Sequence, residues 1–274
     1  MSKHRPEENW GVFLTRIDDE PAAVTVDLGL RGIAPIVSYP QLFVAELQIQ
    51  APRENGFPTA EESNSKLYPI EQAIVGAIQN DQTRAFQVGK IIGGGIVRCF
   101  FYGPLQAEHE TRDPPSHDGE GKGRSSLGQR LDQAMQAFPD YEYRSFERHE
   151  ADWATYLQRL YPSPWELQTI MSRRVLDHLK SQGDQSDRLR EIEHFIVCPD
   201  TAIQTRIAAS AAAIGFRCKT YSISQQGSYA VSLHKHGVPD DIDDIMWPLF
   251  QLAEQQGAVY DGWDARVVKK IARR

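Results

Sequence analysis

The stretch RLREIEHFIVCPDTAIQTRIAASAAAIGFRCKTYSI, residues 188–223, decides the fold of the second half of the chain. It opens with a β-rich run that reaches Cys198, continues with an Ala-rich helical segment that Gly215 ends, and returns to β-rich residues. A strand, a helix and a strand in this order are typical of domains in which the helix packs on a sheet.

The neighbouring segments extend this pattern in both directions. Upstream, Ser163, Pro164 and Glu166 provide an N-cap, a first-turn proline and a capping box, so they predict a helix that ends at Gly183. Downstream, the turn "SQQGS" leads to the strand "YAVSLHKH" and then to "PDDIDDIMWPLFQLAEQQ", a helix with a proline that disturbs its interior. The order predicts a small antiparallel sheet with helices on one face, a ferredoxin-like sandwich.

The first half also mixes strands and helices. Three runs between Trp10 and Gln50 alternate apolar and polar residues, as half-buried strands do. Thr59 and Glu62 have capping-box spacing, so a helix is expected from there to about Asn80, and Pro69 kinks it or splits it in two. This half therefore predicts a second α+β sandwich.

The middle of the first half predicts a hairpin, a polar excursion and further short elements. Gly93–Gly95 separate two β-rich runs; a phosphate loop would need GxxxxGK[ST] and a following helix, and neither is present. Residues 105–126 are polar and Pro/Gly-rich, so we expect a mobile segment with solvated His109 and His117. A helix at 127–138, the strand "YEYRSFERH" and the short helix "DWATYLQRLY" follow.

Length and composition set the domain count and the surroundings. At ~100–200 residues per domain, 274 residues favour two domains, and "YPSPWE" places the junction at about Tyr161, giving domains 1–161 and 162–274. The predicted fold class is α+β, two α/β sandwich domains with mainly antiparallel sheets. The N-terminus lacks an apolar leader and no run approaches ~18 apolar residues, so a soluble, cytoplasmic protein without membrane contact is expected.

Charge and cysteine usage narrow the partners. The net charge of −7 argues against broad nucleic-acid binding, which needs clustered Lys and Arg, and permits contact with a basic protein surface. Arg173, Arg174, Lys180 and the tail "RVVKKIARR" are basic; contact with RNA phosphates is the alternative to a solvated tail, but no aromatic stacking platform accompanies them. The three cysteines follow no zinc or CxxC spacing, which indicates reduced, buried or half-buried thiols: Cys99, Cys198 and Cys218.

Two sets of residues raise the question of chemistry. His234 and His236 lie two apart in a strand, so their side chains share a face, and the carboxylates of "PDDIDD" follow; a metal site or hydrolase is the alternative function. The plainer interpretation is that Asp240 and Asp241 stabilise a helix N-terminus through capping and the helix dipole. No cofactor is expected.

The motif "YDGWD", residues 260–264, is the second such set. Asp261 and Asp264 could act as acid and base, but a carboxylate pair is weak evidence and GxSxG is absent, so no catalytic residue is assigned. Gly262 suits a tight turn with positive φ, while Tyr260 and Trp263 are expected to bury their rings and to seek polar partners. The motif is therefore predicted to be structural, with an edge that borders a partner-binding surface.

At this motif the sequence resembles a known family. "LAEQQGAVYDGWDARV" resembles the C-terminal signature of the regulator of ribonuclease E activity B (RraB) family, and "SQGDQSDRLREIEHFIVCPD" resembles an early segment, with Gly183, Asp184, Arg188, His194 and Phe195 in the matching places. "AAAIGFRCK" is similar to its helix-to-strand step. The resemblance covers about residues 163–268 and implies a non-enzymatic bacterial protein that binds ribonuclease E and lowers RNA cleavage by protein contacts.

The first half resembles an uncharacterised bacterial domain family that is often joined to an RraB-like domain. The segments that carry this resemblance are "ENWGVFLTRIDDEPAAVTVDLGL", "PRENGFPTAEE", "GGGIVRCFFYG" and "DWATYLQRLYPS". It implies no activity. The best-known RraB members are small single-domain acidic proteins, so the extra domain is a departure.

The sequence thus predicts a regulatory, protein-binding protein, and a ribonuclease is the partner that the resemblance implies. A homo-oligomer associated through the N-terminal sheet is a further hypothesis. The candidate partner-binding residues are Asp240, Asp241, Asp243, Asp244, Tyr260, Asp261, Trp263 and Asp264.

Overall fold

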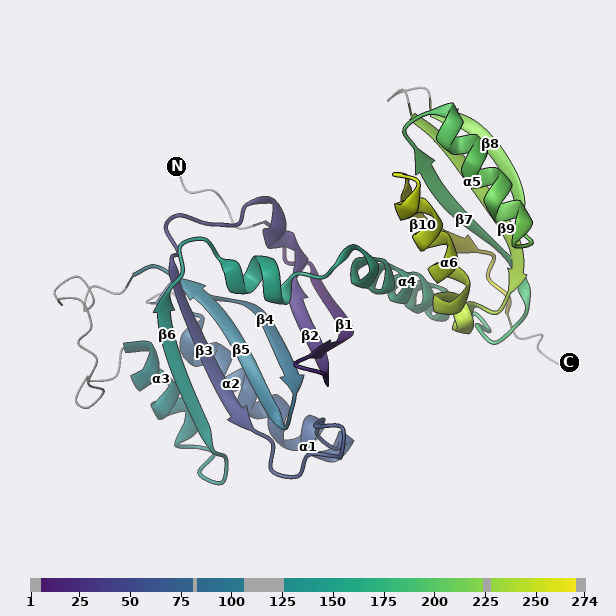
Figure 1. The fold of residues 1–274 in the computed structure, drawn as a ribbon. Coiled ribbons are helices and arrows are strands. Elements are labelled where there is room, and N and C mark those ends of the chain that lie inside the picture. The colour runs from purple at the N-terminus through teal and green to yellow at the C-terminus, as the bar shows by residue number, and fades with distance from the viewer. Residues whose placement is uncertain (1–5, 81–82, 106–125, 224–227, 270–274) are drawn as a thin grey trace, which may run out of the picture. The chain divides into compact units, whose positions relative to one another are not determined.

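The computed structural model describes residues 6–80, 83–105, 126–223 and 228–269 (Figure 1). The chain divides into two compact units, Met1–Pro162 and Ser163–Arg274. Each unit combines an antiparallel sheet with helices, which makes the protein an α+β protein, as the sequence predicts. Within the described ranges, no helix has the length and apolar character needed to cross a membrane.

The first unit is built around a six-stranded sheet in the order β1-β2-β4-β5-β3-β6, in which every neighbouring pair is antiparallel. Its strands are β1 (Trp10–Ile17), β2 (Glu20–Asp27), β3 (Gln41–Gln48), β4 (Phe86–Gly93), β5 (Ile96–Gly103) and β6 (Tyr143–His149). Its helices are η1 (Leu28–Gly32), α1 (Ala60–Glu62), η2 (Ser63–Leu67), α2 (Tyr68–Ile78), α3 (Ser126–Met135) and η4 (Thr155–Leu160).

One face of this sheet packs against α2 and α3, and the alternation of side chains along the strands explains why. Phe43, Ala45 and Leu47 of β3 point to the helices, and so do Val97, Cys99 and Phe101 of β5. They form one core with the apolar stripe of α2, Ile70, Ile74 and Ile78. The segment that contains η4 packs on the opposite face, where it contacts β2 and β4.

Aromatic rings form the contact between this segment and the sheet. Trp153 is fully buried and its ring stacks on Tyr102 of β5, with centroids 4.1 Å apart and planes inclined by 12°. The Trp153 indole donates to the Tyr39 carbonyl at 2.9 Å, and the hydroxyl of buried Tyr156 donates to the Asp27 carbonyl at 2.8 Å. This face also buries Leu42 and Val44 of β3 and Phe100 of β5, and farther along the same two strands it carries Glu46 and Arg98.

Two features of the first unit follow its glycines and prolines. Gly94 and Gly95, with φ of 58° and 74°, form the two-residue turn between β4 and β5, which confirms the predicted hairpin. Pro69 lies at the start of α2, directly after the π-helical turn η2, so the expected long helix changes type at the proline. Most of the polar excursion, with His109 and His117, lies outside the described residues.

The second unit is ferredoxin-like, as predicted. Its strands are β7 (Arg190–Cys198), β8 (Arg217–Ile223), β9 (Ser228–Gly237) and β10 (Val259–Ala265), and its helices are α4 (Pro164–Ser181), α5 (Thr201–Ala213), η5 (Pro239–Asp241) and α6 (Ile242–Gln255). From β7 onward the order is β-α-β-β-α-β, and the sheet runs β10-β7-β9-β8 with all neighbours antiparallel.

A single core joins the sheet to α4, α5 and α6. Ile192, Ile196, Val231 and Leu233 of the two central strands are fully buried in it. Pro248 does not interrupt α6, which runs unbroken from Ile242 to Gln255, so the expected disturbance is not seen.

Candidate functional site

The "YDGWD" motif lies in the edge strand β10, not in a tight turn as the sequence suggested. β10 pairs with β7, with Tyr260 opposite Ile196 and Trp263 opposite His194. The register shifts between Tyr260 and Gly262, and Gly262 has a φ of 110°. The glycine is therefore needed at a β-bulge, where the extra residue turns the strand without ending it.

The Tyr260 ring fills the core beneath the sheet. Tyr260 is 3% exposed, and its hydroxyl lies 2.8 Å from Nδ1 of the fully buried His194. Burial raises the pKa of Tyr260. Burial is also the main cause that lowers the pKa of His194 to about 3, with smaller electrostatic contributions from His234 and Lys235. Both groups are therefore neutral at neutral pH, and this pair is a hydrogen bond inside an apolar core, not an acid–base couple open to solvent.

Trp263 connects the motif to α4. Its ring is 6% exposed, and its indole Nε1 donates to Ser172 Oγ at 3.1 Å. Gln168, one turn earlier on α4, donates to the Tyr260 carbonyl at 2.9 Å. Because β10 is an edge strand, its outward carbonyls need partners, and α4 supplies one. The motif thus holds the additional helix on the ferredoxin-like core.

The two carboxylates of the motif do not form an acid–base pair. Asp261 is exposed at the bulge, and Asp264 is also exposed and accepts a hydrogen bond from the neighbouring Ala265 N–H at 2.7 Å. No hydrogen bond between the two carboxylates is found in the described part of the chain. Of the predicted residues in this motif, only these two present charge to solvent.

The four aspartates of "PDDIDD" lie where β9 passes into α6. Asp240 and Asp241 belong to η5, and Asp243 and Asp244 to the first turn of α6. Asp241 occupies the N-cap position but its side chain makes no capping bond, so the expected side-chain cap is wrong, and the interaction of these carboxylates with the helix dipole stays a prediction. Asp243 is half-buried and accepts from Arg173 at 2.6 Å. The other three aspartates are exposed.

The histidines do not assemble a metal site in the described residues. His234 is 8% exposed, and its Nε2 lies 3.0 Å from Ser232 Oγ and 3.5 Å from Glu193 Oε1. His236, two residues on, is exposed. Across residues 6–80, 83–105, 126–223 and 228–269, no group of three or more His, Cys, Asp or Glu side chains is placed to hold a metal ion.

A buried ion pair that sequence analysis did not identify lies beside this region. Arg190 and Asp184, with side chains 6% and 0% exposed, meet at 2.6 Å. The same Asp184 oxygen accepts from the Val268 N–H at 2.6 Å, and Arg190 also donates to the Arg266 carbonyl at 2.8 Å. The pair ties the segment after β10 to the start of β7. The sequence could have indicated that Arg190 is buried, because residues two apart in a strand face the same side and Ile192 faces the core.

The cysteines provide no reactive thiol. Cys99 and Cys198 are buried and Cys218 is partly exposed, and all three are free. Burial raises the pKa of Cys99 to about 12 and raises the pKa of the other two thiols as well. A thiol with a raised pKa is a poor nucleophile at neutral pH.

The geometry defines a two-unit α+β protein whose second unit is a ferredoxin-like domain with an added N-terminal helix. Two family models match the chain, one in each unit. Residues 8–112 match a family of unknown function, DUF695, and residues 169–265 match the family described as regulator of ribonuclease activity B. The chain thus joins an N-terminal domain of unknown function to a C-terminal RraB-like domain, and the second match supports a regulatory, protein-binding role in general.

No curated protein matches the chain. A crystal structure of an unknown protein from Galdieria sulphuraria is 13% identical with a TM-score of 0.20, and one described as a glycine cleavage system transcriptional repressor is 8% identical with a TM-score of 0.21. Each comparison covers 84% of this chain and 98% of the other.

Proposed function

We propose that the second unit is a regulatory domain that binds a ribonuclease of the ribonuclease E type in the bacterial cytoplasm. It lowers RNA cleavage through protein contacts and catalyses no reaction itself. The observation that carries the proposal is the match of residues 169–265 to a family of ribonuclease regulators.

The use of the family-like motif inside the fold supports a binding role. Tyr260 and Trp263 pack in the core, Trp263 contacts α4, and the hydrogen-bond partners of both side chains are buried. They are therefore not available to a small-molecule substrate. A partner must meet the surface that these residues support, where Asp240, Asp241 and Asp244 are exposed.

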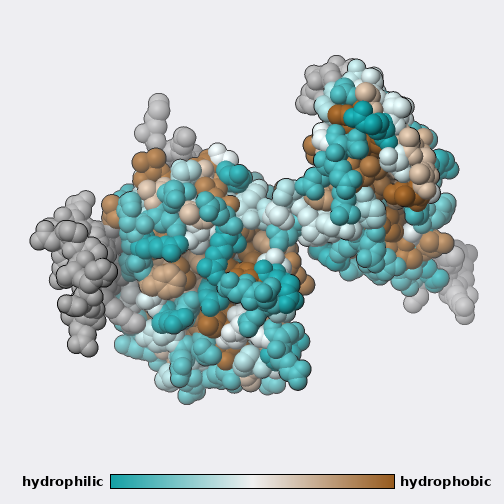
Figure 2. Space-filling view, in the orientation of Figure 1, coloured by the Kyte–Doolittle hydropathy of each residue, from teal (hydrophilic) through white to brown (hydrophobic). Residues whose placement is uncertain are grey.

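The composition of that surface favours a basic protein partner. Trp247 lies three and four residues after Asp244 and Asp243 on α6, so these side chains share one side of the helix. Trp247 is 41% exposed and packs against Trp165 with centroids 4.5 Å apart. Figure 2 shows that the visible surface is mainly hydrophilic, with separate apolar patches. An exposed tryptophan beside carboxylates is a typical feature of a protein–protein interface.

A cleavage assay tests the proposal. Purified full-length chain is added in increasing amounts to ribonuclease E and an RNA substrate, and initial cleavage rates are measured. We expect inhibition by the natural sequence, and at least a ~10-fold higher concentration for half-inhibition when Asp240, Asp241 and Asp244 are all changed to Asn, the equivalent of about 1.4 kcal/mol. Asp243 is left unchanged because it pairs with Arg173.

The matched control removes the same charge elsewhere on the second unit. Asp177, Asp187 and Glu254 are exposed, so changing them to Asn, Asn and Gln should leave inhibition within about twofold, apart from weak long-range screening effects. Equal loss of inhibition in both triple variants would contradict the assigned surface. No inhibition by the folded natural chain would contradict the proposed function.

A further inference from the structure

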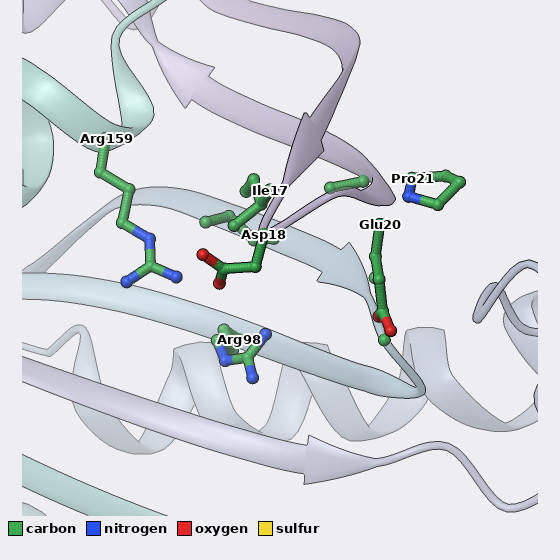
Figure 3. A pocket seen from close by; sticks show the side chains of 10 residues that line it. Ile17, Asp18, Glu20, Pro21, Arg98 and Arg159 are labelled. Atoms are coloured by element: carbon green, nitrogen blue, oxygen red, sulfur yellow. The ribbon is translucent and has the colours of Figure 1, made fainter.

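The first unit has a hollow on the sheet face that α2 and α3 leave uncovered (Figure 3). It has a volume of about 160 Å³, room for several waters or one small molecule. It lies between the ends of the β1–β2 and β4–β5 hairpins. The residues that line it are Ile17, Asp18, Glu20, Pro21, Ala22, Ile91, Gly93, Gly94, Arg98 and Arg159.

A buried carboxylate behind the hollow fixes one arginine. Glu46 of β3 lies between Arg98 of β5 and Arg144 of β6 in the sheet register. Arg98 donates through Nε to Glu46 Oε1 at 2.7 Å, and Arg144 donates through Nε to the other oxygen. Burial alone raises the pKa of Glu46, but the two arginines outweigh it and lower that pKa, so the carboxylate stays ionised.

This arrangement leaves the end of the Arg98 guanidinium available. One carboxylate holds two arginines by Nε alone, and in the described residues the terminal nitrogens of Arg98 have no hydrogen-bond partner. A buried charge of this kind is weak evidence for stability, because desolvation offsets the attraction. The Glu46 carboxylate instead fixes the orientation of the Arg98 guanidinium. An oriented guanidinium can bind a carboxylate in a fixed two-pronged geometry.

The opposite wall supplies a second guanidinium and two carboxylates. Arg159 projects from η4 toward the Asp18 carboxylate, and Arg98 approaches that carboxylate from the other side (Figure 3). Among the described residues, Asp18 forms no ion pair with either arginine. Glu20 lies at the far end against the β4–β5 turn, where a side chain on Gly94 would come within 2.9 Å of its carboxylate.

The charges of the lining decide the class of ligand. Arg98 and Arg159 balance Asp18 and Glu20, so a simple anion would be opposed by the two carboxylates. A small molecule that carries both charges meets no such opposition. We infer that the hollow binds a small zwitterion, a free α-amino acid such as glycine or alanine, with its carboxylate on Arg98 and Arg159 and its ammonium group on Asp18, while Glu20 adds negative charge at the far end of the hollow. This site is independent of the ribonuclease proposal.

Calorimetric titration of the full-length chain tests the inference. The ligands are glycine, alanine, acetate, methylammonium and inorganic phosphate, each titrated separately at the same pH and salt concentration. Glycine or alanine should bind, and acetate and methylammonium should each bind at least ~10-fold more weakly because each satisfies one half of the site. Arg159→Gln and Asp18→Asn should each weaken amino-acid binding by a similar factor, as should Arg98→Gln.

A control variant lies outside the hollow, and two results would overturn the inference. Arg53→Gln removes an exposed arginine of the first unit outside the hollow, and amino-acid binding should be unchanged. Arg159 and Asp18 are exposed, so their variants stay informative if Arg98→Gln fails to fold. No amino-acid binding at millimolar concentration would overturn the inference. The inference would also be overturned if phosphate or acetate bound as strongly as glycine and Asp18→Asn bound glycine as strongly as the natural chain does.

Discussion

The buried His194 should make the stability of the second unit depend on pH in a way that one substitution removes. Burial lowers its pKa from 6.5 to about 3, so in the folded state it stays neutral where the unfolded chain binds a proton. Because the unfolded state holds more protons between these values, lowering the pH favours unfolding. Stability should therefore be lost as pH falls below 6.5 and should level off only near the folded pKa.

The magnitude follows from proton linkage. At about pH 5 the unfolded histidine is almost fully protonated, and the expected loss relative to pH 7 is about 2 kcal/mol from this residue alone. Other groups titrate in the same range, so the comparison is between the natural sequence and His194→Phe. The variant also removes the partner of the Tyr260 hydroxyl, but that cost is the same at both pH values.

Urea unfolding of both proteins at pH 7 and about pH 5, followed by circular dichroism, gives the double difference. We expect the natural chain to lose about 2 kcal/mol more than His194→Phe between the two pH values. His236→Gln, which alters an exposed histidine of the same sheet, should keep the full pH dependence. Parallel losses in the natural chain and His194→Phe would refute the placement of a neutral histidine in the core.

Three substitutions probe the contacts around the motif. Asp184→Asn should destabilise the chain by roughly 3–5 kcal/mol in urea unfolding, because it leaves Arg190 buried without a counter-charge. Gly262→Ala should cost about 1–3 kcal/mol because of the φ of 110°, whereas Gly76→Ala, in an open helical position, should stabilise by about 0.5–1 kcal/mol. Trp263→Phe keeps an aromatic ring but loses the indole hydrogen bond, and should cost about 1–3 kcal/mol.

Each of these has a result that would contradict it. Asp187→Asn changes an exposed aspartate near Asp184 in sequence, so equal costs for the two would remove the case for the buried pair. A stability gain in Gly262→Ala would argue against the bulge. Unchanged stability in Trp263→Phe would mean that the bond to Ser172 contributes nothing.

The second unit was largely predictable because its local signals agree with its topology. Ser163 with Glu166 marks the start of α4, and both capping-box bonds form, at 3.3 Å and 2.7 Å. The periodicity then switches between helix and strand in the order that a ferredoxin-like sheet requires. The rings of Tyr260 and Trp263 are buried with polar partners, as their amphipathic character indicates.

What could not be predicted depends on contacts distant in sequence. The order of the six strands in the first sheet is set by pairings such as Glu46 with both Arg98 and Arg144, which no local pattern reveals. The "YDGWD" glycine indicated a turn because positive φ is commonest there, yet a bulge uses the same backbone freedom. The π-helical turns also leave no clear periodic signal.

The most direct test of the account is the equilibrium dissociation constant between ribonuclease E and the immobilised full-length chain, measured at physiological salt. We expect saturable binding that is weakened at least ~10-fold when Asp240, Asp241 and Asp244 become Asn, with an unchanged unfolding midpoint. Affinity that is the same in that variant, or no saturable binding by the folded natural chain, would contradict it.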